Sequence, residues 1–328
     1  MAGAGLASAA EPNTTARHAQ IDAMVREISP QRIKGYVDRL AGFGTRHTMS
    51  DTVSDTRGIG AARRWIKGEL ERCGAGKLQV AFDGHLHPVD RRLSRPTEIV
   101  NVVATLPGTQ AESRERMYVV SGHYDSRNTD DADAVNDAPG ANDDASGSAL
   151  VLEAARQLSR RKYPVTIVYA LLSGEEQGLF GGRLLAEYAA SQGWQVKAVL
   201  NNDIVGNSCG SDGKCDPDTV RVFSEGPRFD LDDALRAAQR RNGGENDSPS
   251  RNLSRYAAGL DSEAFRVRPI WRADRMGRGG DHLPFLEKGY PAIRFSVGIE
   301  NYNNQHQDLR SEGGIEYGDT VDKVDFAY

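Results

Sequence analysis

The feature that most constrains the fold is an eight-residue segment, Val165–Leu172, in which nearly every side chain is apolar or aromatic. A strand that is apolar along its length must be buried on both faces, as in a parallel sheet covered by helices. Similar runs occur at 99–103, 118–120, 198–200, 220–223 and 292–297, and helices are expected near 146–160, 180–192, 230–242, 258–266 and 282–288. This alternation predicts an α/β fold: a single domain with a central, mostly parallel mixed β-sheet and helices on both faces.

The N-terminal part of the chain is predicted to be helical. Ile33, Val37 and Leu40 recur at helical spacing within the segment 21–43, and a second helix is expected over 60–73. Neither segment contains a cluster of acidic and histidine residues. The chemistry is therefore expected later in the chain.

Both ends of the chain carry weak signals. Residues 1–18 lack periodicity and are expected to be a disordered tail or a signal-peptide remnant, because Ala7-Ser8-Ala9 has the form of a signal-peptidase site. The remaining residues, 19–328, form the predicted domain. The final residues, 325–328, resemble the start of a helix, which suggests a truncated C-terminus.

The bulk composition excludes several classes of protein. Hydrophobic residues make up 38% and charged residues 27% of the 328 residues, and the formal net charge is −5. A slightly acidic chain lacks the basic surface that nucleic acid requires. No apolar run reaches the ~18 residues of a membrane span. We therefore expect a globular protein with no nucleic-acid partner and no membrane span, of unknown oligomeric state.

Two cysteines favour an oxidising compartment. Cys209 and Cys215 flank the turn-rich segment 210–214, where a short disulfide loop is geometrically possible. Such a bond persists only in an oxidising environment. Together with the N-terminal segment, this favours a secreted or periplasmic location, although reduced cysteines would also suit a cytoplasmic protein.

Histidine and acidic residues follow the predicted strands. His123 comes shortly after the run 118–120, and Asp125 could orient its imidazole for metal binding. Asp143 and Asp144 lie in a tight turn before a helix, where one carboxylate can bridge two cations. Ordinary roles exist for each of them, because this His–Asp spacing is common and Asp144 or Ser146 could simply cap the helix.

Two further acidic sites follow later strands. Glu175 and Glu176 come directly after the strand 165–172, where one could bind a metal and the other could accept a proton from water. Asp203 follows the run 198–200 and, taken alone, would be a turn residue. Ligands of such sheets bind at the carboxyl ends of the strands, so four signals at successive strand ends favour a common site.

These motifs together resemble a known family. The segments 122–125, 140–147, 173–178 and 203–206 resemble the motifs of the M28 metallopeptidases, which include bacterial zinc aminopeptidases, and the likeness spans about residues 95–325. The resemblance implies a zinc-dependent exopeptidase fold, two Zn²⁺ ions and a peptide substrate.

The resemblance also implies a role for each matching residue. The implied metal ligands are His123, Asp143, Glu176, Asp203 and His306. Asp143 would bridge the two ions, and Asp125 would orient His123. Glu175 would be the general base that activates water and then protonates the leaving amine.

Two positions require a choice. In the family the last ligand lies in the loop after the strand that matches 292–297, which favours His306 and leaves His282 as the alternative. The residue that stabilises the oxyanion is a tyrosine in related aminopeptidases. Tyr302 is the nearest candidate here, and Arg278 is the other.

The resemblance implies an aminopeptidase, with two alternatives. A glutaminyl cyclase has the same fold but is an acyltransferase with one zinc ion. A binding domain without catalysis would have lost ligands or the base, whereas all six positions are filled here. Several arginines could recognise an acidic group or a terminal carboxylate, or could be solvated loop charges: Arg251, Arg255, Arg272, Arg275 and Arg278.

Overall fold

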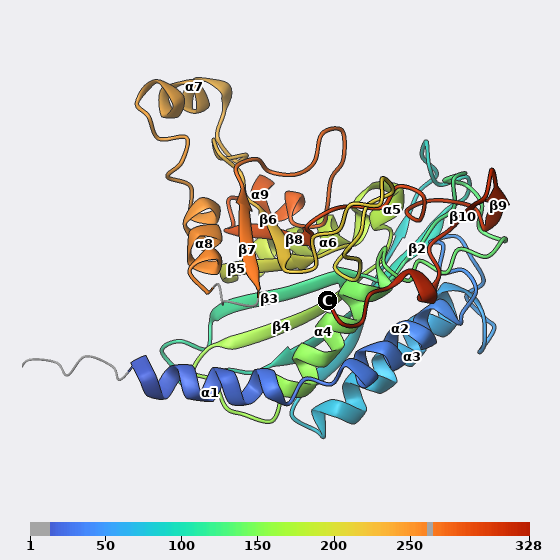
Figure 1. Cartoon of the computed structure of the whole chain (residues 1–328). Coiled ribbons are helices and arrows are strands. Elements are labelled where there is room, and N and C mark those ends of the chain that lie inside the picture. The colour runs from blue at the N-terminus through green and yellow to red at the C-terminus, as the bar shows by residue number, and fades with distance from the viewer. Residues whose placement is uncertain (1–13, 261–264) are drawn as a thin grey trace, which may run out of the picture.

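The computed structural model, which describes residues 14–260 and 265–328, is built around an eight-stranded mixed sheet (Figure 1). Across the sheet the strands are β1 (Gln79–His87), β2 (Thr97–Leu106), β4 (Thr166–Leu172), β3 (Arg116–His123), β5 (Gln195–Asn202), β8 (Ala292–Val297), β6 (Thr219–Phe223) and β7 (Arg266–Ile270). The central strands β4, β3, β5 and β8 are parallel, whereas β2 and β6 run antiparallel to their central neighbours. The predicted α/β fold with a mostly parallel mixed sheet is confirmed.

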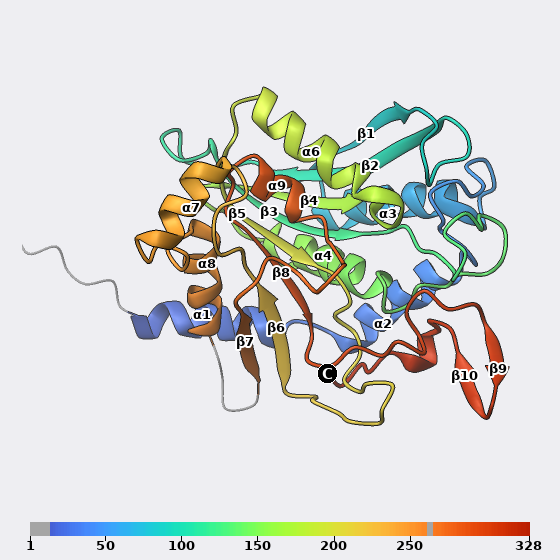
Figure 2. The same ribbon diagram turned by 90° about the horizontal axis from the view of Figure 1, so that it is seen from above.

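Strand β4 shows why this sheet is covered on both faces. Ile167, Tyr169 and Leu171 belong to one core, together with residues of α2 (Pro30–Ala41), α3 (Gly58–Gly74) and α4 (Ala145–Leu158). The alternate residues Val168, Ala170 and Leu172 belong to a second core, with α6 (Phe180–Ser191) and α9 (Leu283–Glu287). Figure 2 shows α6 and α9 over the central strands. The apolar pattern of this strand therefore follows from its two buried faces.

The predicted helical segment 21–43 is in fact two helices. α1 (Thr14–Arg26) ends before Ser29, and α2 starts at Pro30. The Ser29 hydroxyl accepts the backbone N–H of Arg32 at 3.3 Å, which caps α2. Pro30 has no N–H with which α1 could continue. Of the expected tail over 1–18, residues 1–13 lie outside the described residues, and α1 already begins at Thr14.

Of the helix predicted over 258–266, residues 261–264 lie outside the described residues, and the described positions after Ala258 are not helical. α8 (Pro249–Ala258) begins earlier, because Ser248 accepts the N–H of Arg251 at its N-terminus, and β7 follows from Arg266. Strand β1 was not predicted: it lies at the sheet edge and exposes most of its residues, and Asp83 and Gly84 interrupt the short alternation of Val80, Phe82 and Leu86. α7 (Asp233–Arg241) lies where a helix was expected.

The C-terminal residues do not start a helix. After the hairpin of β9 (Arg310–Glu312) and β10 (Ile315–Tyr317), the 3-10 turn η1 (Val321–Lys323) is followed by a turn at Asp325. The Asp325 carboxylate accepts the N–H groups of Ala327 and Tyr328. The Tyr328 hydroxyl donates to the Thr219 carbonyl at 2.7 Å, which ties this end to β6.

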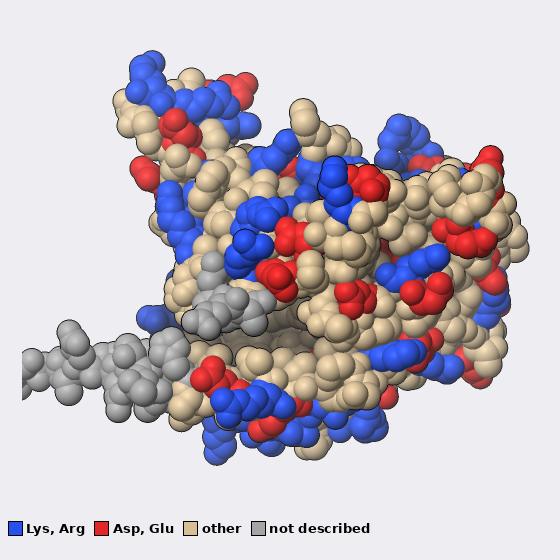
Figure 3. All heavy atoms as spheres, viewed as in Figure 1, with Lys and Arg blue, Asp and Glu red and all other residues tan. Residues whose placement is uncertain are grey.

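Three further predictions concern the disulfide, membrane-spanning segments and the distribution of surface charge. Cys209 and Cys215 are joined by a disulfide. Within the residues that the structure describes, no helix is long and apolar enough to cross a membrane. On the face seen in Figure 3, acidic and basic side chains are interspersed rather than gathered into a basic patch.

Candidate metal centre

The candidate site lies where neighbouring parallel strands end. β3 ends at His123, which is opposite Leu172, the last residue of β4. Glu175 opens α5 (Glu175–Gly178) three residues after β4, and Asp203 directly follows β5. The parallel arrangement therefore brings residues that are far apart in sequence to one edge of the sheet.

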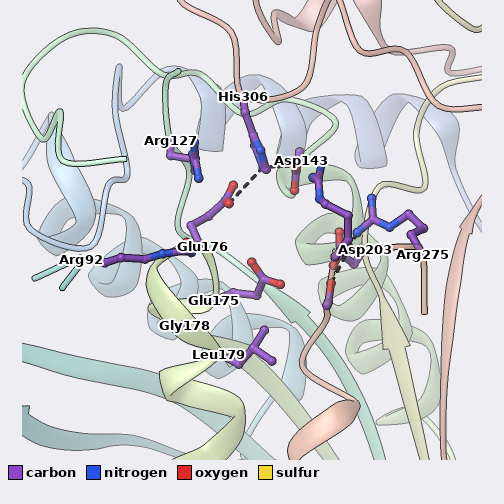
Figure 4. A pocket seen from close by; sticks show the side chains of 13 residues that line it. Arg92, Arg127, Asp143, Glu175, Glu176, Gly178, Leu179, Asp203, Arg275 and His306 are labelled. Carbon is purple, nitrogen blue, oxygen red and sulfur yellow. Dashed lines mark hydrogen bonds and ion pairs between the residues drawn. The ribbon is translucent and has the colours of Figure 1, made fainter. Parts of the chain in front are cut away.

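Asp143, in the loop before α4, lies between two groups of side chains (Figure 4). Its Oδ1 is 3.2 Å from His123 Nε2, and its Oδ2 is 2.9 Å from His306 Nε2. Each group could hold one cation, because its ligand atoms lie within 4.8 Å of one another: His123, Asp143 and Asp203 in the first group, and Asp143, Glu176 and His306 in the second. A carboxylate shared in this way is the usual bridge between two metal ions.

The first group is buried and strongly polar. His123 Nε2 lies 3.8 Å from Asp203 Oδ1 and 3.9 Å from Glu175 Oε2. Burial by itself lowers the pKa of His123, but Glu175 and the hydrogen-bonding acids around the ring raise it well above its ordinary value. This imidazole is therefore surrounded by negative charge, which is the environment that attracts a cation.

The second group is centred on His306, in the loop after β8. Its Nε2 lies 3.0 Å from Glu176 Oε2. Burial lowers the pKa of His306, but Glu176 and Asp143 outweigh that effect and raise it to about 9. Its φ of 54° lies in the left-handed region, which costs a non-glycine residue about 1–2 kcal/mol. Such strain concentrates at functional sites, where the surrounding structure holds it.

The side chains fit a pair of zinc-like cations. The buried polar atoms without a hydrogen-bond partner, in the part of the chain that the structure describes, include His123 Nε2 and Glu176 Oε1. Unpartnered buried polar atoms are costly unless something else satisfies them. Imidazole nitrogen and carboxylate oxygen are donors that Zn²⁺ prefers. The two groups therefore suit two divalent cations of this kind.

Glu175 belongs to neither metal group but lies beside the first. Its side chain is 11% exposed. Burial raises the pKa of Glu175 well above its ordinary value, and Asp203 and Glu176 raise it further, whereas His123 opposes the shift. A carboxyl group in this setting is suited to holding a proton next to the site.

Asp125 connects His123 to the segment that carries the two glutamates. Its carboxylate lies 3.5 Å from His123 Nδ1. The same carboxylate accepts the backbone N–H groups of Glu175 at 3.3 Å and Glu176 at 3.1 Å. Asp125 therefore positions the start of α5 as well as the imidazole, a second function that the sequence did not indicate.

Two further acids hold the loop of Asp143. The expected cap role of Asp144 is confirmed: its Oδ1 accepts the Gly147 N–H at 2.9 Å, and its Oδ2 accepts the His123 N–H at 3.1 Å. Asp319 accepts the Asp143 N–H at 2.7 Å. Asp319 was not predicted, because no local motif marks a residue so far along the chain.

Arg294, on β8, introduces a positive charge into the first group. The side chain is fully buried. Its Nη2 lies 2.9 Å from Asp203 Oδ1, and its Nη1 lies 2.9 Å from Asp274 Oδ1. Burial raises the pKa of Asp203, but Arg294 and His123 outweigh that effect and lower it. Arg294 was not predicted, because in the sequence it is one residue of a strand and no local motif indicates that it pairs with Asp203.

A cavity of about 370 Å³ opens onto both groups. Its lining includes four arginines: Arg92, Arg127, Arg275 and Arg278. Arg275 and Arg278 were among the predicted recognition residues, whereas Arg92 and Arg127 were not. The remaining predicted arginines lie elsewhere, and Arg251 and Arg255 stack on Trp271 with their guanidinium carbons 4.9 and 5.9 Å from its ring.

Two predicted residues are not brought to the metal groups. Tyr302 is 56% exposed and is not among the residues that line the cavity. Arg278, the other candidate for stabilising an oxyanion, does line it. His282 is fully buried, and its Nε2 lies 2.7 Å from the Ala273 carbonyl oxygen, so this ring is used in packing the loop rather than in either group.

Comparison with known proteins gives consistent matches. The model of peptidase family M28 matches residues 101–313. A probable zinc metalloprotease of Leptosphaeria maculans is 47% identical over 315 residues, covering 94% of this chain and 73% of that protein. A probable zinc metalloprotease of Pyricularia oryzae is 47% identical over 319 residues, covering 94% of this chain but only 63% of that protein. The chain thus spans roughly two thirds of these relatives.

Solved structures share the fold at low sequence identity. The LapA aminopeptidase of Legionella pneumophila matches with a TM-score of 0.64 and 19% identity, over 94% of this chain and 70% of that chain. A glutaminyl cyclase of Porphyromonas gingivalis matches with a TM-score of 0.58 and 18% identity, over 91% and 92%. At such identities the similarity establishes the fold alone.

Proposed function

This chain belongs to peptidase family M28, and on that premise we propose that it is a zinc metallopeptidase that uses two zinc ions to release N-terminal residues from peptides. The observation that carries the proposal is the position of Asp143. Its two carboxylate oxygens face His123 and His306, one in each metal group. A site for a single cation would not need a carboxylate with both oxygens engaged in this way.

The residues would divide the work as follows. One ion would be held by His123, Asp143 and Asp203, and the other by Asp143, Glu176 and His306. When bound, the ions would supply Lewis-acid activation of water and of the scissile carbonyl.

Glu175 would take the proton from the attacking water and deliver it to the leaving amine. It is free for this task because it belongs to neither metal group, and it lies within 3.9 Å of His123 Nε2. Asp125 would keep Glu175 in place through the hydrogen bond to its backbone N–H.

The choice of an aminopeptidase over other exopeptidases rests on likeness. LapA, whose fold this chain shares, is named an aminopeptidase. The curated relatives are named only as probable zinc metalloproteases. The direction of cleavage in this chain is therefore part of the proposal.

A glutaminyl cyclase is the second candidate, and one specific observation favours it. Arg294 contacts Asp203 at 2.9 Å and so already supplies a positive charge to the first group. If that charge keeps a cation from binding there, only the second group would be filled, as in an enzyme with one zinc ion. Glutaminyl cyclases also share the fold.

Metal analysis combined with a substrate panel tests the proposal. We expect two zinc ions per chain by elemental analysis. We also expect release of the first residue from unblocked aminoacyl-anilides and peptides, lost on N-acylation or chelation and restored by zinc. One zinc ion together with cyclisation of N-terminal glutamine would instead establish the cyclase. Zinc-loaded protein without turnover of any substrate would leave a binding domain.

We also propose that the protein acts outside the reducing cytoplasm. The Cys209–Cys215 disulfide supports this location, because such bonds persist only where conditions are oxidising. Fractionation of the native cells, with the thiol state of both cysteines measured in each fraction, tests this proposal. A fully reduced pair in the cytoplasmic fraction would contradict it.

A further inference from the structure

The cavity over the metal groups is lined by an unusual set of charges. Its acidic residues are Asp143, Glu175, Glu176 and Asp203, and its arginines are Arg92, Arg127, Arg275 and Arg278. In Figure 4 the labelled arginines flank the carboxylates, with Arg92 and Arg127 on one side and Arg275 on the other. Leu179 is the one apolar side chain among the lining residues. The cavity therefore offers a substrate charges rather than a hydrophobic pocket.

These carboxylates are all used by the proposed chemistry. Three of them are metal ligands, and Glu175 is the base. Two divalent cations would balance the four negative charges, so a loaded site keeps the charge of the arginines.

The four arginines differ in how far their charge is already neutralised. Arg275 is paired with Glu300 at 2.7 Å and with Asp274 at 3.3 Å, so its charge is used within the protein. Arg92 donates to the Glu176 carbonyl oxygen at 2.9 Å and lies 3.6 Å from Asp131. This arginine is therefore partly neutralised.

Arg127 and Arg278 are the two arginines of the cavity that have no carboxylate partner among the described residues. The Arg127 guanidinium donates only to the backbone carbonyls of Asn128 and Thr129. Arg278 is exposed, and none of the ion pairs in the described chain involves it. Guanidinium groups placed in this way bind a carboxylate well, because their planar donors match its two oxygens.

We propose that Arg127 and Arg278 bind a carboxylate of the substrate beside the scissile bond, so that the enzyme acts on short or acidic peptides. This inference rests on the proposed function, because the substrate is the peptide cleaved at the metal groups. The carboxylate can have two sources, the C-terminus of a di- or tripeptide or an acidic side chain next to the cleaved bond. A cavity of about 370 Å³ is the size of a small-ligand site.

Two matched pairs of substrates separate these sources. With the N-terminal residue held constant, a dipeptide acid is compared with its amide, and a Glu-amide is compared with a Gln-amide. We expect at least one carboxylate substrate to exceed its neutral partner about tenfold or more in kcat/KM, as a charged hydrogen bond predicts. The preference should shrink at high salt.

Variants connect this preference to the two arginines. Arg278→Gln and Arg127→Gln should each lower the carboxylate preference severalfold, by raising KM for the carboxylate substrates more than for the neutral ones, and Arg278→Lys should retain part of the preference. Arg272→Gln is the matched control, because Arg272 is exposed in the same loop but does not line the cavity. Equal losses for both members of a pair would overturn the inference and indicate a role in the chemical step.

Binding measurements keep this inference separate from the proposed function. In the Glu175→Gln variant loaded with zinc, calorimetry should show tighter binding of the carboxylate member of a pair. That result without any turnover by the wild type would reject the peptidase but keep the carboxylate site. Chelator-sensitive hydrolysis with each pair matched within twofold, in both kcat/KM and Kd, would reject the carboxylate site but keep the peptidase.

Discussion

The carboxylate of Asp319 accepts a hydrogen bond from the backbone N–H of Asp143 at 2.7 Å. It also accepts the N–H of Asn142, at 2.9 and 3.0 Å to its two oxygens, and it is buried. A residue 176 positions later in the chain therefore fixes the loop that carries the shared ligand of both metal groups.

Removing this carboxylate should weaken metal binding. Asp319→Ala leaves two buried N–H groups without an acceptor and frees the Asp143 loop, so we expect zinc affinity to fall about 10–100-fold. Competition with a chelator of known affinity measures the change. Asp322→Ala, at an exposed position nearby, should bind zinc as the wild type does. Unchanged zinc affinity in Asp319→Ala would show that this hydrogen bond does not hold the ligand.

The Glu175 carboxylate should be needed for turnover but not for zinc binding. Glu175→Gln keeps the shape of the side chain but cannot accept a proton, so we expect kcat to fall about 10²–10⁴-fold while zinc content stays at the wild-type level. Elemental analysis and steady-state kinetics on one preparation check both parts. Glu176→Gln is the contrasting variant, because it should lose zinc. Normal hydrolysis by Glu175→Gln would mean that another group is the base.

The two histidines can be separated by their zinc content. His306→Ala removes a ligand of the second group, so about half of the bound zinc should be lost. His282→Ala removes a buried ring that contacts the Ala273 carbonyl, so it should lower the melting temperature more than the zinc content. Zinc analysis and thermal unfolding of both variants check this. A larger zinc loss in His282→Ala would reverse the assignment.

Arg294 should be important for stability. Arg294→Met removes the arginine partner of the buried Asp203 and leaves the buried Asp274 with Arg275 as its remaining arginine, so we expect the free energy of unfolding to fall by about 3–5 kcal/mol without metal. Zinc should restore part of the loss, because a cation can neutralise Asp203 but not Asp274. Urea unfolding with and without zinc measures both effects.

An exposed ion pair provides the control for Arg294. Arg268 lies 2.9 Å from Asp216, but about half of its side chain is exposed. Arg268→Met should therefore cost no more than about 1 kcal/mol. Equal losses in Arg268→Met and Arg294→Met would contradict the importance given to burial.

The raised pKa of Glu225, a residue outside the metal groups, predicts how the free energy of unfolding depends on pH. Burial raises the pKa of Glu225 to about 7. The folded state therefore holds this proton more tightly than the unfolded state, whose glutamate titrates near 4.3. The stabilisation is complete below about pH 4 and is lost as the pH rises through 7, by up to ~3 kcal/mol.

Glu225→Gln should remove that loss, because glutamine does not titrate. Urea unfolding between pH 5 and 8 should show a smaller fall in the free energy of unfolding for the variant than for the wild type. Glu112→Gln, at an exposed position, should follow the wild-type curve. Parallel curves for all three proteins would show that Glu225 does not titrate in this range.

The strand ends could be recognised from the sequence because their signals are local. The apolar run 165–172 requires two buried faces, and Glu175 and Glu176 follow it directly. His123 and Asp203 are placed in the same way by β3 and β5. These residues lie at one edge of the sheet because the carboxyl ends of parallel strands lie at the same edge.

Other elements could not be predicted because their signals are weak or distant. β1 is an exposed edge strand, and Asp83 and Gly84 interrupt the short alternation of Val80, Phe82 and Leu86. Tyr302 lies close to His306 in sequence, yet their loop exposes Tyr302 to solvent, whereas Arg278 lines the cavity from another loop, between β7 and α9. Sequence proximity is a poor guide in loops, because their course depends on what they pack against.

The sequence by itself determined the class of fold and predicted four residues of the candidate metal groups, because burial and strand direction act through short segments, whereas His306 was implied by the family resemblance. Tertiary structure alone decided that Asp143 faces both histidines and which arginines line the cavity. It also decided that Asp319 accepts the Asp143 N–H and that Arg294 pairs with Asp203. The physical reason is that charges and hydrogen bonds act over a few ångströms in space. Partners far apart in the chain meet only after the sheet has formed.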